Sequence, residues 1–133
     1  MFSITVTPRF GDIDGLGHVN NTVPSVWFET GRTPLLKMFD PELSLDKTKF
    51  PLIIAHLDFD FVNQIFLRSD VTIKTWISRI GTKSFTVYHE AWQEERLCVK
   101  GNAVIAYFNF ITEKTMPIPD DKRKLLEEHF IQE

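Results

Sequence analysis

The sequence predicts an α+β fold in which an antiparallel sheet of about five strands packs on one long helix. One supporting observation is a single amphipathic segment near the start of the chain, at residues 21–39. Another is a series of alternating segments between residues 53 and 111, separated by short turns, which indicates a meandering sheet. The chain has 133 residues, the length of one domain, which we expect to span residues 1–133.

The first predicted element is a strand at residues 2–7, where apolar and polar side chains alternate up to Pro8. A polar, glycine-rich turn follows at residues 9–21. Glycine permits backbone angles and close approaches that a side chain would block, and Asp, Asn and His side chains bind nearby backbone groups. We expect Asn20 or Asn21 to be the N-cap of the helix that comes next.

The predicted helix covers residues 21–39 and has one apolar face. In its first turns, the positions of this face are Val23, Val26, Trp27 and Thr30. Pro24 is compatible with the first turn of a helix, which places the start of regular helix near Asn21. Gly31 and Pro34 should bend or break the helix further on.

A polar loop at residues 40–50 leads to predicted strands at 53–62, 71–77 and 85–92. The first of these strands has an apolar and a polar face. The apolar face consists of Leu57, Phe59 and Phe61, and the polar face of His56, Asp58 and Asp60. Gly81 interrupts the alternation between the second and third strands, which we expect to pair as two long neighbours.

Two elements complete the chain. Residues 97–111 are apolar at consecutive positions, so we expect this strand to be buried on both sides. Asp120 or Asp121 should cap a last helix at residues 122–130, whose mixed charges indicate a solvated face.

Charge and composition exclude several classes of protein. A net charge of −3 and a pI near 5.8 give no general attraction to nucleic acid or to an anionic membrane, so we expect neither partner. Cys98 is the single cysteine, which excludes an internal disulfide and favours a reduced, cytoplasmic protein. Residues 1–7 do not resemble a signal peptide, and no apolar window reaches the length of a membrane span.

The polar turn at residues 9–21 is the candidate for chemistry. A helix that begins just after such a turn directs unpaired N–H groups and its positive dipole end back at it. This arrangement attracts anions and stabilises a carbonyl oxygen that becomes negative, while a carboxylate upstream attacks or takes a proton, which indicates acyl chemistry. The alternative is structural, because Asp-x-Asp before glycines also forms turns in which the carboxylates bind local N–H groups.

The four histidines do not predict a metal site. His18, His56, His89 and His129 lack the spacing of metal ligands, and the carboxylates do not cluster around them. We therefore expect no metal and no cofactor.

The turn has the pattern Arg9-x-x-Asp12-x-Asp14-x-x-Gly17-His18-Val19-Asn20-Asn21, and Trp27, Glu29 and Arg32 follow it. This pattern resembles the opening of the hotdog-fold acyl-CoA thioesterases of the 4-hydroxybenzoyl-CoA thioesterase type. Two later landmarks extend the resemblance over nearly the whole chain: the turn Arg79-Ile-Gly-Thr-Lys-Ser84 and the segment Met116-Pro-Ile-Pro119. The resemblance implies a hotdog fold, in which the sheet wraps round the long helix.

The resemblance also implies a catalytic carboxylate and an oxyanion site. Asp14 takes the place of the carboxylate, and Asp12 is the less suitable candidate. Backbone N–H groups from Val19 to Asn21 would polarise the thioester carbonyl. Pro24 departs from the family pattern, which usually has an aromatic residue there, often tyrosine; the change affects the pocket wall and leaves the nucleophile in place.

Other polar residues receive supporting roles. His18 and Asn20 would fix the turn or position a water molecule. By the resemblance, Glu29 would support the site, although it is also placed to pair with Arg32 one helical turn away. Lys83 and Ser84 are the candidates for binding the phosphates of CoA.

A second copy of the chain is the expected partner. The sheet has edges with unpaired backbone groups, which a second copy covers by joining the two sheets. The resemblance implies a homodimer with the active site at the subunit interface, and dimers that pair further into tetramers.

These observations predict hydrolysis of an acyl-CoA thioester to a free acid and CoA, with Asp14 as nucleophile or as general base. One alternative is a hotdog module that binds acyl thioesters without turnover. Another is a hotdog hydratase acting on enoyl thioesters. The segment Gly11-Asp12-Ile13-Asp14-Gly15 departs from the Gly-Asp-x-Asn-Pro motif of those hydratases, and His18 lies one residue too far on.

Overall fold

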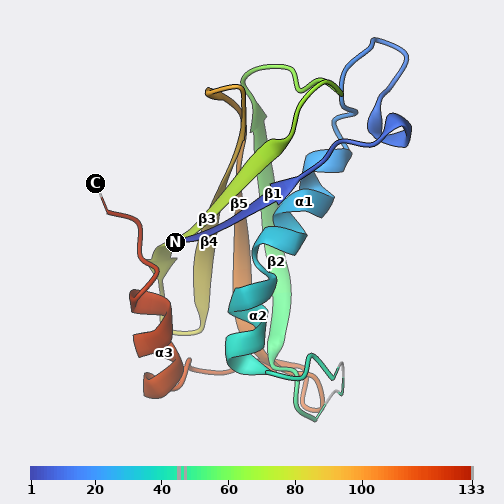
Figure 1. Cartoon of the computed structure of the whole chain (residues 1–133). Helices are drawn as coiled ribbons and strands as arrows, with labels where there is room; N and C mark the ends of the chain where they lie inside the picture. Colours follow the sequence, from blue (N-terminus) through green and yellow to red (C-terminus); the bar gives the residue numbers. More distant parts are fainter. Residues whose placement is uncertain (45, 47, 133) are drawn as a thin grey trace.

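A computed structural model describes residues 1–44, 46 and 48–132. These residues form one antiparallel sheet of six strands. The strands are β1 (Phe2–Val6), β2 (Leu52–Phe61), β3 (Val71–Ile80), β4 (Ser84–Gln93), β5 (Arg96–Asn109) and β6 (Lys114–Thr115). The helices are η1 (Phe10–Asp12), α1 (Val23–Gly31), α2 (Thr33–Phe39) and α3 (Asp120–Glu127). Helices α1 and α2 follow one another along the sheet, and α3 lies near the C-terminus (Figure 1). The predicted α+β class is confirmed.

The strand order differs from a meander. The strands lie in the order β1-β3-β4-β5-β2, with the short β6 beside β5, so β2 and β3 are not neighbours. The segment at residues 62–70 carries the chain across the end of the sheet. The buried amide of Gln93 holds this crossing, because it accepts a hydrogen bond from the Phe66 N–H (2.9 Å) and donates to the Phe66 (2.7 Å) and Ser69 (2.8 Å) carbonyls.

The predicted helix is broken, as Gly31 and Pro34 indicated, and the two halves α1 and α2 meet at Arg32. The N-cap prediction was wrong, because the cap position is Thr22. Asn20 instead closes the turn before the helix, where its side-chain oxygen accepts bonds from the Thr22 N–H (2.9 Å) and hydroxyl (2.8 Å). The loop predicted at 40–50 is confirmed where it is described; its residues 45 and 47 lie outside the described residues.

The buried face of α1 also differs from the predicted one. Val26 and Thr30 are exposed, whereas the buried residues of α1 are Pro24, Trp27, Phe28 and Gly31. Gly31 explains this orientation. A Cβ atom there would lie 3.0 Å from Ile73 Cγ2 and 3.0 Å from Thr75 Oγ1, so the glycine allows the helix to lie against β3.

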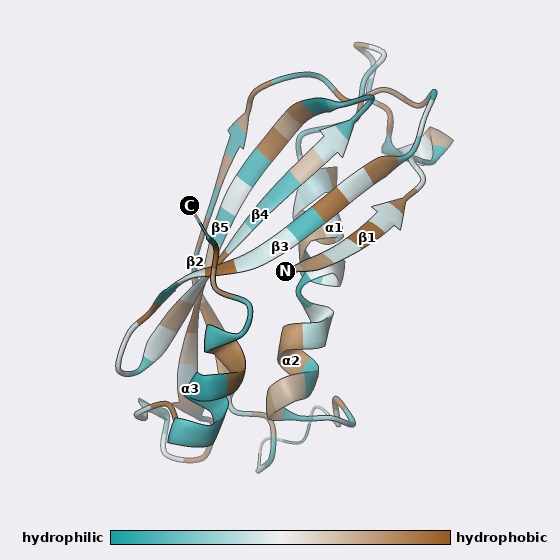
Figure 2. Ribbon diagram, turned by 60° about the vertical axis from the view of Figure 1, so that its left-hand side comes forward, coloured by the Kyte–Doolittle hydropathy of each residue, from teal (hydrophilic) through white to brown (hydrophobic). Residues whose placement is uncertain are grey.

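The sheet alternates as predicted in its centre and less so at its edge. Inward positions of β3 and β4 are buried and outward ones are partly exposed, which gives the banded hydropathy of Figure 2. One face of β5 is buried from Val99 to Ile105, and on the other face Val104 and Phe108 are partly exposed, so burial on both sides was overestimated. β2 is an edge strand with exposed apolar residues, among them Leu57 and Phe61.

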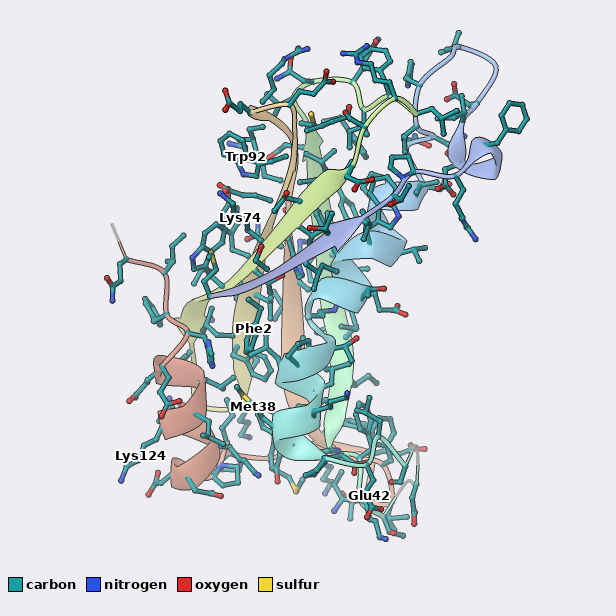
Figure 3. All side chains as sticks on the ribbon, viewed as in Figure 1. Phe2, Met38, Glu42, Lys74, Trp92 and Lys124 are labelled. Carbon is teal, nitrogen blue, oxygen red and sulfur yellow. The ribbon has the colours of Figure 1, made fainter. Side chains whose placement is uncertain are left out.

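Side chains sort to the two faces of the sheet. Phe2 and Met38 pack between the sheet and α2, while Lys74 lies over the Trp92 ring, 5.0 Å from its centroid, on the face away from α1 and α2 (Figure 3). Among the described helices, none combines the length and the apolar character that crossing a membrane requires.

The C-terminal helix starts earlier than predicted and is shorter. Its N-cap is Pro119, so Asp120 and Asp121 lie in the first turn and do not cap it. The helix ends at Glu127 because the chain then pairs with β3, where the Ile77 N–H donates to the His129 carbonyl (2.9 Å).

Candidate active site

The polar turn is held in shape by Asp12. This carboxylate is 5% exposed, and it accepts hydrogen bonds from the backbone N–H (2.8 Å) and the guanidinium (3.3 Å) of Arg9. Its own carbonyl accepts the Asn20 N–H at 2.8 Å, which closes the loop between them. Asp12 therefore has a structural role in this turn.

Asp14 lies on the adjoining tight turn and is only partly buried. Its N–H donates to the His18 carbonyl (3.0 Å), and its carbonyl accepts the Gly17 N–H (3.1 Å). Gly17 has φ +86°, a conformation that favours glycine. One carboxylate oxygen of Asp14 accepts the Leu16 N–H at 2.9 Å, and the other has no hydrogen-bond partner in the described part of the chain. Asp14 thus has one oriented oxygen and one available oxygen.

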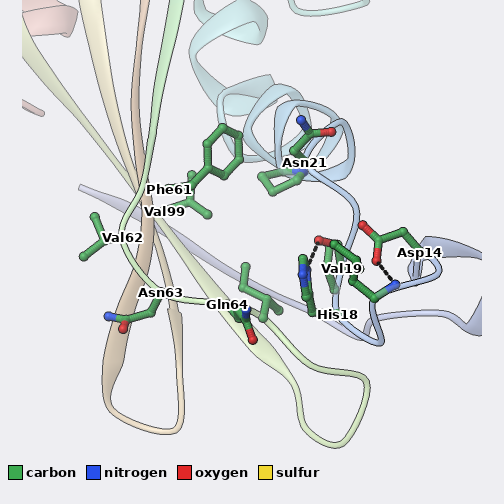
Figure 4. Close-up of a pocket in the computed structure, with 12 residues that line it drawn as sticks. Asp14, His18, Val19, Asn21, Phe61, Val62, Asn63, Gln64 and Val99 are labelled. Atoms are coloured by element: carbon green, nitrogen blue, oxygen red, sulfur yellow. Dashed lines mark hydrogen bonds between the residues drawn. The ribbon is translucent and has the colours of Figure 1, made fainter.

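Asp14 faces a pocket of about 390 Å³ between the polar turn and the segment that follows β2 (Figure 4). We call it the turn pocket. From the polar turn and α1 it is lined by Asp14, Leu16, His18, Val19, Asn21 and Pro24, and from the sheet side by residues 61–65 and Val99. The Val19 N–H donates to the Ile65 carbonyl at 2.7 Å, which joins the two walls. Residues 61–65 were not predicted as part of the site, because their contact with the polar turn joins positions far apart in the sequence.

The backbone N–H groups expected to form an oxyanion site are mostly occupied. That of Val19 is bound to Ile65, and that of Asn20 to Asp12, so neither is available to a ligand. The Asn21 N–H has no acceptor within the described residues, and Asn21 lines the pocket beside Asp14. The predicted set of donors is therefore reduced to Asn21.

His18 also lines the turn pocket. Its Nδ1 lies 3.3 Å from the Val19 carbonyl oxygen, which orients the ring as Figure 4 shows. Asn20 has no place in the pocket lining, since its side chain binds Thr22. No group of three or more His, Cys, Asp or Glu side chains suited to a metal ion occurs among residues 1–44, 46 and 48–132.

Comparison with known proteins assigns the chain to a family. A family model described as the thioesterase-like superfamily matches residues 8–126. The chain belongs to this superfamily. Its fold matches that of a predicted thioesterase from Bacillus stearothermophilus, with 44% sequence identity, a TM-score of 0.94, and coverage of 99% of this chain and 98% of the other.

Two further relatives of this thioesterase-like protein are more distant. A thioesterase from Thermus thermophilus, crystallised with coenzyme A and zinc, has 24% identity and a TM-score of 0.80, over 92% of this chain and 94% of the other. The protein YsmA of Bacillus subtilis (strain 168) is 23% identical over 91% of this chain and 82% of its own length. Together with the strand order, these matches identify the curled sheet round α1 and α2 as a hotdog fold.

Besides Asn20, three residues predicted for the site lie outside the turn pocket of this thioesterase-like chain. Glu29 is exposed further along α1 and lines a different pocket with Arg32. Lys83 and Ser84 lie at the turn between β3 and β4, beside α3 and at the other end of the sheet (Figure 1). Within one chain the structure brings together Asp14, His18, Val19 and Asn21 and leaves these three apart.

A buried polar cluster in the thioesterase-like fold was not predicted. His89 is 1% exposed, and its Nδ1 lies 3.0 Å from Thr75 Oγ1 and its Nε2 3.4 Å from Arg32 Nη1. Burial, with a smaller contribution from the charge of Arg32, lowers the pKa of His89 to about 3. The sequence signal was a histidine at an inward position of an alternating strand, between Val87 and Ala91.

Proposed function

We propose that this protein hydrolyses an acyl-CoA thioester to a free carboxylic acid and CoA. The observation that carries the proposal is the turn pocket, whose lining includes both Asp14 and Asn21. Within the described residues, one carboxylate oxygen of Asp14 and the backbone N–H of Asn21 have no hydrogen-bond partner. Membership of the thioesterase-like superfamily supports the reaction class, and the Thermus thermophilus thioesterase with bound coenzyme A supports the thiol carrier.

Two routes use the same groups. In the first, the free oxygen of Asp14 attacks the thioester carbonyl, the C–S bond breaks to release CoA as a thiolate, and water then hydrolyses the mixed anhydride. In the second, Asp14 accepts a proton from a water molecule that attacks the carbonyl directly. In both, the Asn21 N–H donates to the developing oxyanion, where one such donor contributes roughly 3 kcal/mol.

A homodimer is part of the proposal. β2 is an edge strand whose exposed apolar residues include Ile54, Leu57 and Phe61, and a second copy would cover them by extending the sheet. In such a dimer, Lys83 and Ser84 would reach the CoA phosphates only from the other copy, because within one chain they lie at the far end of the sheet. Pairing of dimers into a tetramer stays a prediction.

One observation favours a second candidate, a module that binds acyl thioesters without turnover. Two of the three N–H groups expected for the oxyanion are occupied, and Pro24 has no N–H to add. Such a pocket still accommodates an acyl thioester but stabilises the oxyanion with fewer donors.

The test is thiol release from short, long and aromatic acyl-CoAs by the protein and by its Asp14→Asn variant. We expect turnover in the original chain and a loss of at least about 100-fold in the variant. The matched control is Asp121→Asn on α3, an exposed aspartate far from the pocket, which should retain full activity. Equal rates for Asp14→Asn would remove Asp14 from its role, and acyl-CoA binding without thiol release would establish the binding module.

A further inference from the structure

A second pocket, of about 260 Å³, lies between α1–α2 and the first half of β2. We call it the helix pocket. Its lining is mainly apolar, and the apolar residues are Leu36, Phe50, Leu52, Ile53, Ile54 and Ile105. The charged groups in the lining are Arg32 and Glu29. A cation among aliphatic walls is the feature that needs an explanation.

Arg32 has more donors than the protein uses. The residue is 4% exposed, and within the described chain its side chain makes one hydrogen bond, from Nη1 to His89 Nε2 at 3.4 Å. A guanidinium carries five N–H donors and no acceptor. The single fully buried side-chain nitrogen or oxygen without a partner, among the described residues, is Ser69 Oγ. The other side-chain nitrogens of Arg32 are therefore not fully buried, and the residue lines the helix pocket.

The charge of Arg32 is not balanced by a direct ion pair. His89 is neutral at neutral pH, because burial lowers its pKa to about 3. Arg32 can only donate, so Nε2 of His89 accepts and its Nδ1–H faces Thr75 Oγ1. Glu29 raises the pKa of Arg32 and burial lowers it more strongly, and no salt bridge joins these two side chains in the described chain. Arg32 is thus a poorly hydrated cation with free donors.

We propose that the helix pocket binds a carboxylate carried on an apolar chain, with Arg32 donating to the carboxylate and the aliphatic wall packing on the chain. Arginine pairs with carboxylates through parallel N–H donors, and such charge-assisted bonds are stronger where water is excluded. The apolar lining and the small volume suit an alkyl chain of short or medium length.

Two sources supply this chemistry. One is a free carboxylic acid, and the other is the distal carboxylate of a dicarboxylic acyl thioester. The second source rests on the proposed function, because its other end would be the thioester in the turn pocket. Both pockets contact α1, the first at Pro24 and the second at Glu29.

Calorimetric titration with octanoate and with 1-octanol tests the proposal on the intact chain. Both probes have the same apolar chain, so the difference between them reports the carboxylate. We expect octanoate to bind at least about tenfold more tightly than octanol. Equal affinities, or no binding of either probe, would overturn the proposal.

Two variants locate the effect. Arg32→Gln should reduce the affinity for octanoate to that of octanol. Glu29→Gln removes the negative charge at the rim and should tighten octanoate binding several-fold without changing octanol binding. Glu127→Gln on α3 is the matched control, with the same change of charge at an exposed site outside the helix pocket. If Arg32→Gln does not fold, the Glu29→Gln variant tests the proposal. An octanoate affinity equal to that of the original chain would contradict a carboxylate site at Arg32.

Thiol release from octanoyl-CoA and octanedioyl-CoA separates the two sources. A KM at least tenfold lower for octanedioyl-CoA, with the advantage lost in Arg32→Gln, assigns the pocket to the distal carboxylate. Equal KM values, combined with octanoate binding, assign it to the free acid. If neither thioester is hydrolysed, the proposed function fails, while the calorimetric comparison still decides this proposal.

Discussion

The turn pocket and the helix pocket both contact α1 but are built from different elements. The first takes its polar groups from irregular backbone, held by long-range bonds such as that from the Val19 N–H to Ile65. The second takes its charge from Arg32, which is buried between regular elements and rests on His89 and Thr75. The contrast indicates that substitutions in the turn pocket change activity with little effect on the free energy of unfolding. Substitutions beneath the helix pocket should mainly lower the free energy of unfolding.

The largest effect on stability is expected from Gly31→Val. The added side chain would meet the buried Ile73 and Thr75, whose atoms lie 3.0 Å from the ideal Cβ position. We expect the free energy of unfolding to fall by about 3 kcal/mol, measured by urea denaturation. Gly11→Val is the matched control, because nothing lies within 4 Å of its ideal Cβ. Similar losses in both variants would contradict the close packing of α1 on β3.

Acidification should destabilise the protein through His89. The pKa of this residue is lowered to about 3 in the folded state, so between pH 6.5 and 3 the unfolded chain binds more protons than the folded one. The contribution of neutral His89 to the free energy of unfolding is complete above pH 6.5 and is lost as the pH falls. The loss is up to ~1.4 kcal/mol per pH unit, or roughly 2 kcal/mol at pH 5. Denaturation at pH 7 and pH 5 measures the loss.

A His89→Gln variant isolates this effect from the titration of carboxylates. Glutamine offers an acceptor and a donor but does not titrate in this range. The variant should therefore show a smaller loss of stability between pH 7 and pH 5 than the original chain. An equal loss in both proteins would exclude His89 as its source.

Asn20→Ala should have a smaller effect. It removes the acceptor of two hydrogen bonds from Thr22, at 2.9 and 2.8 Å, in an exposed turn. We expect a loss of about 1 kcal/mol in the free energy of unfolding. Thr22→Val deletes one of the two bonds and should cost less; a larger loss for Thr22→Val would show that the turn depends on Thr22 in another way.

The smallest effect on stability is expected for Asp14→Asn, the variant in which we expect the largest loss of activity. In Asp14→Asn, the side-chain oxygen that accepts the Leu16 N–H is retained. The free energy of unfolding should change by less than about 0.5 kcal/mol, although thiol release falls. A Tm shift of many degrees in this variant would show that Asp14 holds the turn, and the contrast between the two pockets would fail.

The local elements were predictable where a short stretch of sequence determines the structure. Alternation gave the strands β3 and β4 because their inward positions are buried, and Gly31 with Pro34 gave the break at Arg32. The place of β2 beside β5 was not predictable, since strand pairing depends on the whole sheet. The rotation of α1 that exposes Val26 depends on how closely Gly31 approaches β3.

In the candidate site, too, local features were predictable and features that depend on long-range contacts were not. Asp14, His18, Val19 and Asn21 are close in sequence and share one pocket, as the motif indicated. Whether the Val19 N–H is free depends on Ile65, more than forty positions along the chain, so no local pattern predicts it. Lys83 and Ser84 were predicted to bind the phosphates of CoA, and within the single chain they lie at the far end of the sheet from Asp14.

The Val19 N–H is hydrogen-bonded within the fold and the Asn21 N–H is not, and this difference can be detected by spectroscopy. Amides bonded within a fold exchange with solvent slowly, and unbonded ones exchange quickly. In the free protein, the Val19 amide should be protected and the Asn21 amide should not. A ligand whose oxygen accepts from Asn21 would slow exchange at that amide alone, so an NMR spectrum would detect occupation of the turn pocket without any turnover.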